Sequence, residues 1–273
     1  MNVKTLQEIP PWEWPDGTAE ILLEVLQDQQ SDAADRLVAA ELAGDFVVVN
    51  EDLVAALLEI LRSAHEAEDL RGNAAIALGP VLEQGFITEF DDPDDVPISE
   101  ETFDTIRESL RALYADGSVP DAVRRRILEA SVRAPDDWHA DAVRAAYARS
   151  EHAWKLTGAF CMRFLRGFDA QILAALESGD PELEYEAVCA AGNWELGAAW
   201  PHVAALVTSE NIDKALLLAA IEAVGCIRPH EAADILDELT NSDDEDIADA
   251  ANEALAMAGV LNDLDDEDDE DDD

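Results

Sequence analysis

Hydrophobic residues recur along this chain at the three- and four-residue spacing of an amphipathic helix. In NEDLVAALLEILRS, the apolar residues Leu53, Leu57, Ile60 and Leu61 fall on one face of a helix. Asn50 stands just before them, where its side chain can cap the first helical turn. The two acidic residues that follow suit the positive end of the helix dipole. The segment therefore predicts an amphipathic helix after Asn50.

Two other segments combine this spacing with a capping residue. In SEETFDTIRESLRALY, Ser99 is the expected N-cap and the apolar residues share one face. In DPELEYEAVCAAG, Asp180 is the expected N-cap and Pro181 stands at the first helical position, which tolerates proline. The one strand-like run, FVVVN at 46–50, is expected to connect two helices. The pattern as a whole predicts an all-α fold.

Four segments share one arrangement of apolar and small residues. They are DLRGNAAIALG ending at Gly79, ELEYEAVCAAG ending at Gly192, ALLLAAIEAVG ending at Gly225, and DIADAANEALA ending at Ala256. The last three end 33 and 31 residues apart, which leaves room for two helices of about 12 residues and their turns. Small alanines would let neighbouring helices pack closely, and each terminal glycine is expected to be a helix C-cap.

This spacing resembles the HEAT repeat, and especially the short bacterial HEAT-like repeat first associated with phycobilisome lyases. The resemblance implies an all-α, right-handed α-solenoid of about seven helix pairs with a concave binding face. The arginine usual near the start of the family's second helix is present as Arg71, whereas Glu184, Leu217 and Ala248 replace it in the other three segments. The expected helix pairs lie at about 18–44, 50–85, 99–134, 137–166, 168–193, 197–228 and 230–258.

The formal net charge of -46 is distributed unevenly along the chain. Acids far outnumber bases in 1–99 and 167–261, whereas 100–166 carries equal numbers, and the chain ends in NDLDDEDDEDDD. Neighbouring carboxylates in that ending lie within a Debye length of about 8 Å, so their repulsion predicts a disordered polyacidic tail at 261–273. The expected organisation is a cap segment at 1–17, a solenoid at 18–260 with an acidic loop at 86–98, and this tail.

No catalytic or metal-binding motif stands out. The five histidines are dispersed, and HExxH, GxSxG, P-loop and zinc spacings are missing. Cys161, Cys189 and Cys226 lie far apart in apolar patterns, which favours free buried thiols. The acidic loop lacks the glycine that a calcium-binding loop needs at its turn. We therefore expect a non-enzymatic protein without cofactor or metal.

Aromatic and arginine clusters allow both packing and binding interpretations. In PPWEWP, Trp12 and Trp14 are expected to cover the open end of the first helix pair, with a docking segment as the alternative. Trp138, Trp154, Trp194 and Trp200 are expected to pack between helices, with interface anchors as the alternative. The run Arg124–Arg126 spreads around a helix, so at least one of its members should pair with a neighbouring acid such as Asp121 or Glu129.

Charge suggests the class of partner. Nucleic acid and anionic membranes would be repelled by this field, and a basic protein is its complement. The start of the chain has no apolar leader, so the protein is expected in the cytoplasm.

We predict a non-catalytic scaffold or chaperone that binds a basic protein through its concave face and tail. One alternative is adaptation to a salty cytoplasm, which the near absence of lysine fits; another is a lyase-type enzyme accessory. The candidate partner-binding residues are Asp91, Asp92, Asp94, Asp95, Asp263, Asp265, Asp266, Glu267, Asp268, Asp269, Glu270, Asp271, Asp272 and Asp273.

Overall fold

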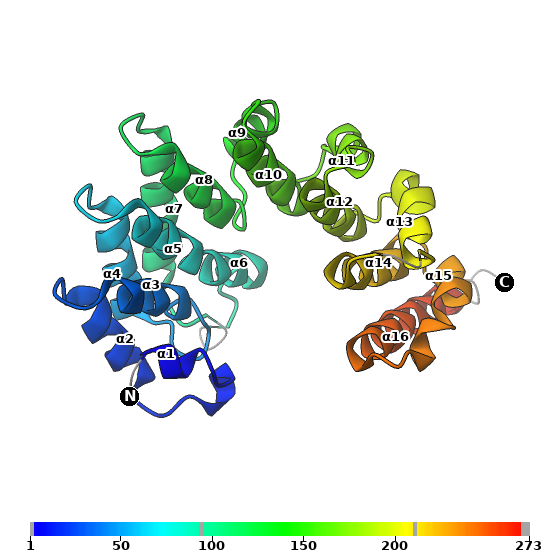
Figure 1. Ribbon diagram of the computed structural model, residues 1–273, viewed down its shortest axis with the longest axis horizontal. Coiled ribbons are helices and arrows are strands. Elements are labelled where there is room, and N and C mark those ends of the chain that lie inside the picture. The colour runs from blue at the N-terminus through cyan, green and yellow to red at the C-terminus, as the bar shows by residue number, and fades with distance from the viewer. Residues whose placement is uncertain (1–2, 93–95, 210–211, 269–273) are drawn as a thin grey trace. The chain divides into compact units, whose positions relative to one another are not determined.

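The computed structural model describes residues 3–92, 96–209 and 212–268, with side chains up to residue 259. Within these residues every regular element is a helix, so the predicted all-α, solenoid-type fold class is confirmed. None of the described helices combines the length and apolar character needed to cross a membrane. The chain divides into an N-terminal unit, Met1–Arg144, and a C-terminal unit, Ala145–Asp273 (Figure 1).

The N-terminal unit is a stack of helix pairs preceded by a short cap. Its elements are α1 (Val3–Leu6), η1 (Pro11–Glu13), α2 (Thr18–Gln27), α3 (Ala33–Leu42), α4 (Glu51–Arg62), α5 (Glu68–Ala77), α6 (Gly79–Thr88), α7 (Glu100–Ala115) and α8 (Asp121–Ser131). Helix α9 (His139–Tyr147) contains the division between the units. Side chains of Asn50 and Ser99 accept backbone N–H groups as predicted, at the starts of α4 and α7.

The C-terminal unit continues with three more helix pairs after α10. Its elements are α10 (His152–Cys161), η2 (Met162–Phe164), α11 (Asp169–Leu176), α12 (Pro181–Asn193), η3 (Gly197–Ala199), α13 (Trp200–Val207), α14 (Lys214–Ile227), α15 (Pro229–Leu236), η4 (Leu239–Asn241) and α16 (Glu245–Asp268). Asp180 caps α12 with Pro181 at its first position, as predicted. Each of the seven predicted ranges contains at least two described helices, but the range 50–85 is not a simple pair, because α6 begins at Gly79 directly after α4 and α5.

The glycines that end the repeated segments lie where neighbouring helices pack closely. They are not helix C-caps, so that prediction is wrong. Gly192 and Gly225 lie inside α12 and α14, and Gly79 begins α6. None of the three has the positive φ of a capping glycine. A Cβ on Gly192 would lie 3.0 Å from Ala223 of the next inner helix, and one on Gly225 would lie 3.2 Å from Ala254. The missing side chain therefore allows tight packing between repeats.

A second-helix arginine recurs in the N-terminal unit and binds the end of the first helix of its own pair. Each of three arginines donates to the carbonyl of the residue ten positions earlier, at 2.9–3.0 Å. The pairs are Arg36–Leu26, Arg71–Leu61 and Arg124–Tyr114. We call these three contacts the arginine clamps. They satisfy carbonyls that a helix end leaves without an intrahelical partner.

The N-terminal tryptophans have different roles. Trp14 packs against the core, and its indole N–H donates to the carbonyls of Leu6 and Ile9, so it caps the first helix pair as predicted. Trp12 is 78% exposed, and its predicted capping role is wrong because η1 turns its side chain outward. Trp154 is buried, in agreement with a packing role.

The last helix differs from the sequence prediction in where it ends. The prediction ends the final helix near Gly259 and starts the tail at 261, whereas α16 runs through Asp268. Gly259 does not adopt a positive φ, so nothing in its backbone stops the helix there. Residues 269–273 lie outside the described residues.

Candidate functional site

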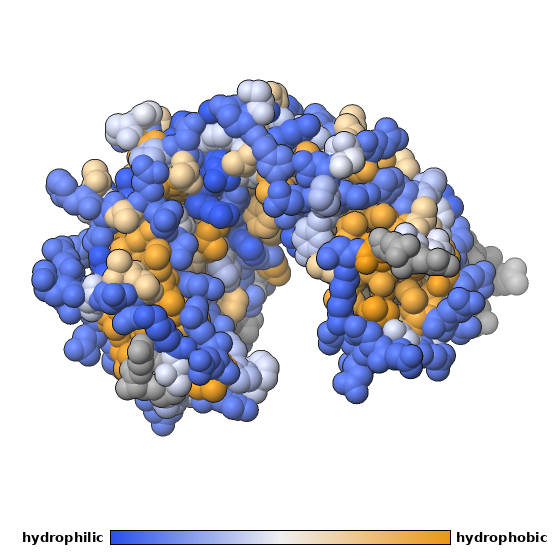
Figure 2. Space-filling model, in the orientation of Figure 1, coloured by the Kyte–Doolittle hydropathy of each residue, from blue (hydrophilic) through white to orange (hydrophobic). Residues whose placement is uncertain are grey.

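A groove of about 710 Å³ lies on the C-terminal unit over α12, α14 and α16. Figure 1 shows these three second helices side by side, and α14 packs against both of the others. Figure 2 shows hydrophobic residues gathered in the region of α13 to α15, bordered by hydrophilic ones. Its lining combines an apolar floor with a charged border.

Helical spacing brings the groove residues of α14 and α16 onto one face of each helix. On α14, Ala215, Leu218, Ala219 and Glu222 share one face because they are separated by three, four and seven residues. On α16, Asp246, Asp249, Ala250 and Glu253 repeat the same steps. Alanines on these faces form part of the floor, and the acids on the same faces, Glu222 on α14 and Asp246, Asp249 and Glu253 on α16, supply the charged border.

The carboxylates of the groove differ in whether a cation neutralises them. Asp246 forms an ion pair with Lys214, whose Nζ lies 2.7 Å from Asp246 Oδ2. Lys214 also forms an ion pair with Asp244. Within the part of the chain that the structure describes, no ion pair engages Glu222, Asp249 or Glu253. These three acids leave an uncompensated negative surface beside the apolar floor.

The positive end of the groove is already paired. Arg163 lies 3.4 Å from Glu186 and over the ring of Phe160. Its Nε atom is buried without a hydrogen-bond partner in the described structure. The groove therefore presents a net excess of negative charge.

Two of the three cysteines line the groove as neutral groups. Burial raises the pKa of the Cys189 thiol above its ordinary value, and the Glu186 carboxylate raises it further against the effect of Arg163. Burial also raises the pKa of Cys226, with Glu222 acting in the same direction. Both thiols stay protonated at neutral pH and behave as small apolar side chains.

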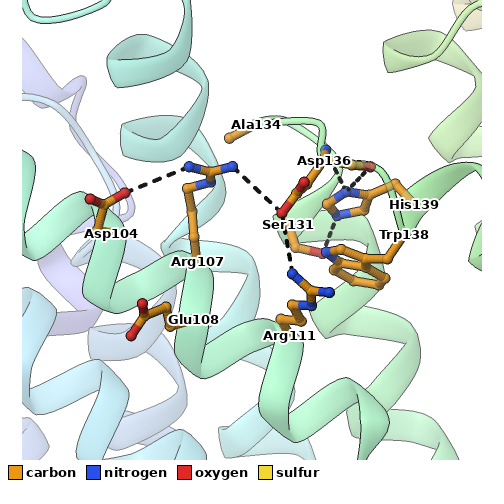
Figure 3. Close-up of a pocket in the computed structure, with 9 residues that line it drawn as sticks. All are labelled: Asp104, Arg107, Glu108, Arg111, Ser131, Ala134, Asp136, Trp138 and His139. Carbon is orange, nitrogen blue, oxygen red and sulfur yellow. Dashed lines mark hydrogen bonds and ion pairs between the residues drawn. The ribbon is translucent and has the colours of Figure 1, made fainter.

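A smaller pocket of about 250 Å³ lies in the N-terminal unit between α7 and the loop that precedes α9 (Figure 3). Arg107 and Arg111, one helical turn apart, both approach the Asp136 carboxylate at 3.7 Å. Arg107 also lies 3.6 Å from Asp104. These contacts neutralise much of the charge that lines the pocket.

A serine–histidine pair lies at the wall of this pocket. His139 Nε2 is 3.0 Å from Ser131 Oγ, and the Asp136 backbone N–H donates to His139 Nδ1 at 2.9 Å. Because Nδ1 accepts, the ring proton is on Nε2 and donates to the serine, which is the wrong direction for activating a nucleophile. Burial lowers the pKa of His139 to about 4. The pair is a structural contact.

The predicted partner-binding residues fall in both units. Asp91 and Asp92 are exposed just after α6 in the N-terminal unit. Asp94 and Asp95 lie outside the described residues, as do 269–273 at the end of the chain. The acids from Asp263 to Asp268 belong to the last turns of α16, where only the backbone is described. The groove carboxylates were not predicted, although their three- and four-residue spacing among alanines is visible in the sequence.

The predicted arginine pairing is confirmed in α8. Arg124 pairs with Asp121 at 3.3 Å, and Arg126 pairs with Glu129 at 2.6 Å.

The stacked helix pairs and the groove on their second helices define a helical-repeat protein. No family model matches the chain, and no curated protein matches it. Among solved structures, it is similar to Escherichia coli YibA, at 14% identity and a TM-score of 0.48 over 90% of this chain and 83% of that one. It is also similar to human deoxyhypusine hydroxylase in complex with glycerol, at 15% identity and a TM-score of 0.41 over 94% and 88% of the two chains. A designed armadillo repeat protein matches at 14% identity and a TM-score of 0.34 over 87% and 98%.

Proposed function

We propose that this chain is a HEAT-like scaffold without chemistry of its own, and that its C-terminal unit binds a basic segment of a partner protein. The observation that supports this most directly is the set of acids Glu222, Asp249 and Glu253, which no ion pair in the described structure engages, beside an apolar floor. Charged groups at an interface steer partners and fix their register, while apolar contacts hold them. The protein is expected to act in the cytoplasm.

The groove suits an amphipathic helix better than an unstructured polycation. Its floor of alanines and protonated cysteines can accept an apolar stripe, and its border can accept the lysines or arginines on either side of that stripe. A segment with charge alone would leave the floor exposed to water. Affinity should therefore depend on both the apolar stripe and the basic flanks.

The test is fluorescence anisotropy with a labelled helix-forming peptide that has leucines on one face and lysines flanking them. The groove variant is E222Q/E253Q. Its matched control is D234N/E238Q, which removes the same charge from one exposed position on α15 and another just after it, both outside the groove. We expect the groove variant to weaken binding by about tenfold, equivalent to about 1.4 kcal/mol, and the control to change it less than about twofold.

Two further variants separate contact from long-range attraction. A250W should fill the floor and weaken binding without changing the net charge, because Ala250 lines the groove. A chain ending at Leu261 should bind with slower association and a weaker dependence on salt if the tail steers the peptide. Equal losses in the groove and control variants would reject the groove as the site. No binding of the basic peptide at low salt, together with unfolding unless salt is high, would favour salt adaptation instead.

A further inference from the structure

Three donor groups from two helix starts meet on the surface of the C-terminal unit. His152 begins α10, Asp180 caps α12, and Glu182 lies in the first turn of α12. One nitrogen of the histidine and one oxygen of each carboxylate all lie within 4.8 Å of one another. His152 Nε2 is 2.8 Å from Asp180 Oδ2 and 3.7 Å from Glu182 Oε2.

These separations match the ligands of a small divalent ion. Zinc binds imidazole nitrogen and carboxylate oxygen at about 2.0–2.2 Å, so two ligands at the tetrahedral angle lie about 3.4 Å apart. The two distances fall on either side of that value, and a shift of less than about 1 Å in exposed side chains would bring both to it. The side chains of His152, Asp180 and Glu182 are 48%, 30% and 64% exposed, so water has access to complete the coordination.

The central ligand is held in position by the helix that it caps. Asp180 Oδ1 accepts the backbone N–H groups of Glu182 and Leu183, at 3.1 and 3.3 Å. The Asp180 N–H in turn donates to Ser178 Oγ at 3.2 Å. With Oδ1 engaged in this way, Oδ2 is turned toward the histidine. Such contacts behind a ligand orient it and typically raise metal affinity.

We propose that His152, Asp180 and Glu182 form a site for a transition-metal ion of the zinc class. One imidazole and two carboxylates favour such an ion over magnesium or calcium, which prefer all-oxygen sites with more ligands. The bound ion joins the start of α10 to the start of α12, across 28 residues of chain. This site is separate from the groove and does not depend on the proposed function.

The main difficulty for a test is the diffuse attraction of cations by a chain with a net charge of -46. The full-length protein is therefore treated with a chelator, exchanged into buffer with millimolar magnesium, and titrated with zinc by calorimetry. We expect one saturable zinc per chain above the magnesium background. Titration with cobalt should give visible absorption bands of an ordered site, and the His152 ring nitrogen signals should shift with the same stoichiometry.

Three variants decide the outcome. D180N keeps an N-cap, because asparagine caps helices as well as aspartate, but it replaces the anionic Oδ2 by an amide nitrogen or a neutral oxygen. H152N and E182Q remove the other donors, and E177Q is the matched control at an exposed acid of the same unit. We expect the three site variants to weaken zinc binding at least about 30-fold and the control to leave it unchanged. The proposal is overturned if zinc shows no saturable site above magnesium, or if D180N and H152N bind it as tightly as the unmodified chain.

Discussion

Removing the clamp at Arg36 should destabilise the N-terminal unit by a measurable pair energy. Arg36 makes two charge-assisted hydrogen bonds to Glu66, at 2.8 and 2.9 Å, and a third to the carbonyl of Leu26. The arginine and glutamate side chains are only 10% and 17% exposed. The contact joins the ends of α2 and α3 to the turn between α4 and α5, so it connects two successive helix pairs.

The magnitude follows from the number and setting of these bonds. Hydrogen bonds to charged groups contribute about 1.5–3 kcal/mol each when buried. Because Arg36 and Glu66 are still partly exposed to solvent, we expect their contribution near the lower end of this range. We expect R36M to cost about 3 kcal/mol, because it leaves both Glu66 and the Leu26 carbonyl without this partner. E66Q should cost about 1 kcal/mol, and the double-mutant cycle should give a coupling of about 2 kcal/mol.

The same pair sets the direction of a pH effect. The hydrogen bond from Arg36 lowers the pKa of Glu66 below its ordinary value of 4.5. Stability from this pair is therefore fully present above pH 4.5 and is lost as the pH falls through the lower pKa of the folded state. In R36M this contribution to the acid sensitivity of the unit should disappear.

The assay is urea unfolding at pH 7 and pH 4, with hydrogen exchange of α2 to α5 to assign the change to this unit. The control is the Arg144–Asp141 pair, whose side chains are 53% and 92% exposed, where a cycle should give less than about 0.5 kcal/mol. A coupling at Arg36 and Glu66 as small as that of the control would refute the reasoning from burial and geometry.

Three other predictions concern single positions. His139, with a pKa of about 4 against 6.5 when unfolded, should contribute stability that is complete above pH 6.5 and falls by about 3 kcal/mol as the pH drops to 4; nitrogen NMR should find it neutral with the proton on Nε2 at pH 6. G44A should cost more than about 2 kcal/mol in urea unfolding, because its Cβ would lie 2.3 Å from a backbone oxygen of α5, whereas G117A, with open space around it, should stay within about 0.5 kcal/mol. W14F should cost about 1–2 kcal/mol by losing two indole hydrogen bonds, and W12F should be neutral; equal effects would contradict the assigned cap.

The helices and their pairing could be predicted because the signals are local. Amphipathic spacing and capping residues such as Asn50 act within one or two turns, so the sequence displays them directly. Arg36 and Arg124 stand at the same place in their segments as Arg71, but the looser apolar pattern around them hides this repeat in the sequence. The glycine C-caps were wrong because a sequence does not show whether a glycine ends a helix or admits a neighbouring one.

The sites depend on which helix faces meet, and spacing in the chain does not display this. The groove acids lie on α14 and α16, and the whole of α15 and η4 separates these two helices in the sequence. His152 and Asp180 are 28 residues apart and meet because the starts of α10 and α12 lie together, so a search for short metal-binding motifs could not find them. The charge composition predicts a basic partner. Which acids lack an ion pair in the described residues, such as Glu222, depends on how the helices pack and is not visible in the sequence.

The arginine clamps also bear on the order in which the chain folds. Each clamp joins residues only ten positions apart, so little chain entropy is lost in closing it, and contacts of such short range form early. During synthesis the N-terminal segments emerge first. Each clamped helix pair can therefore fold while the next pair is still being synthesised. The acidic C-terminal helices have Glu184, Leu217 and Ala248 in place of the arginine, so they fold onto N-terminal pairs that are already formed.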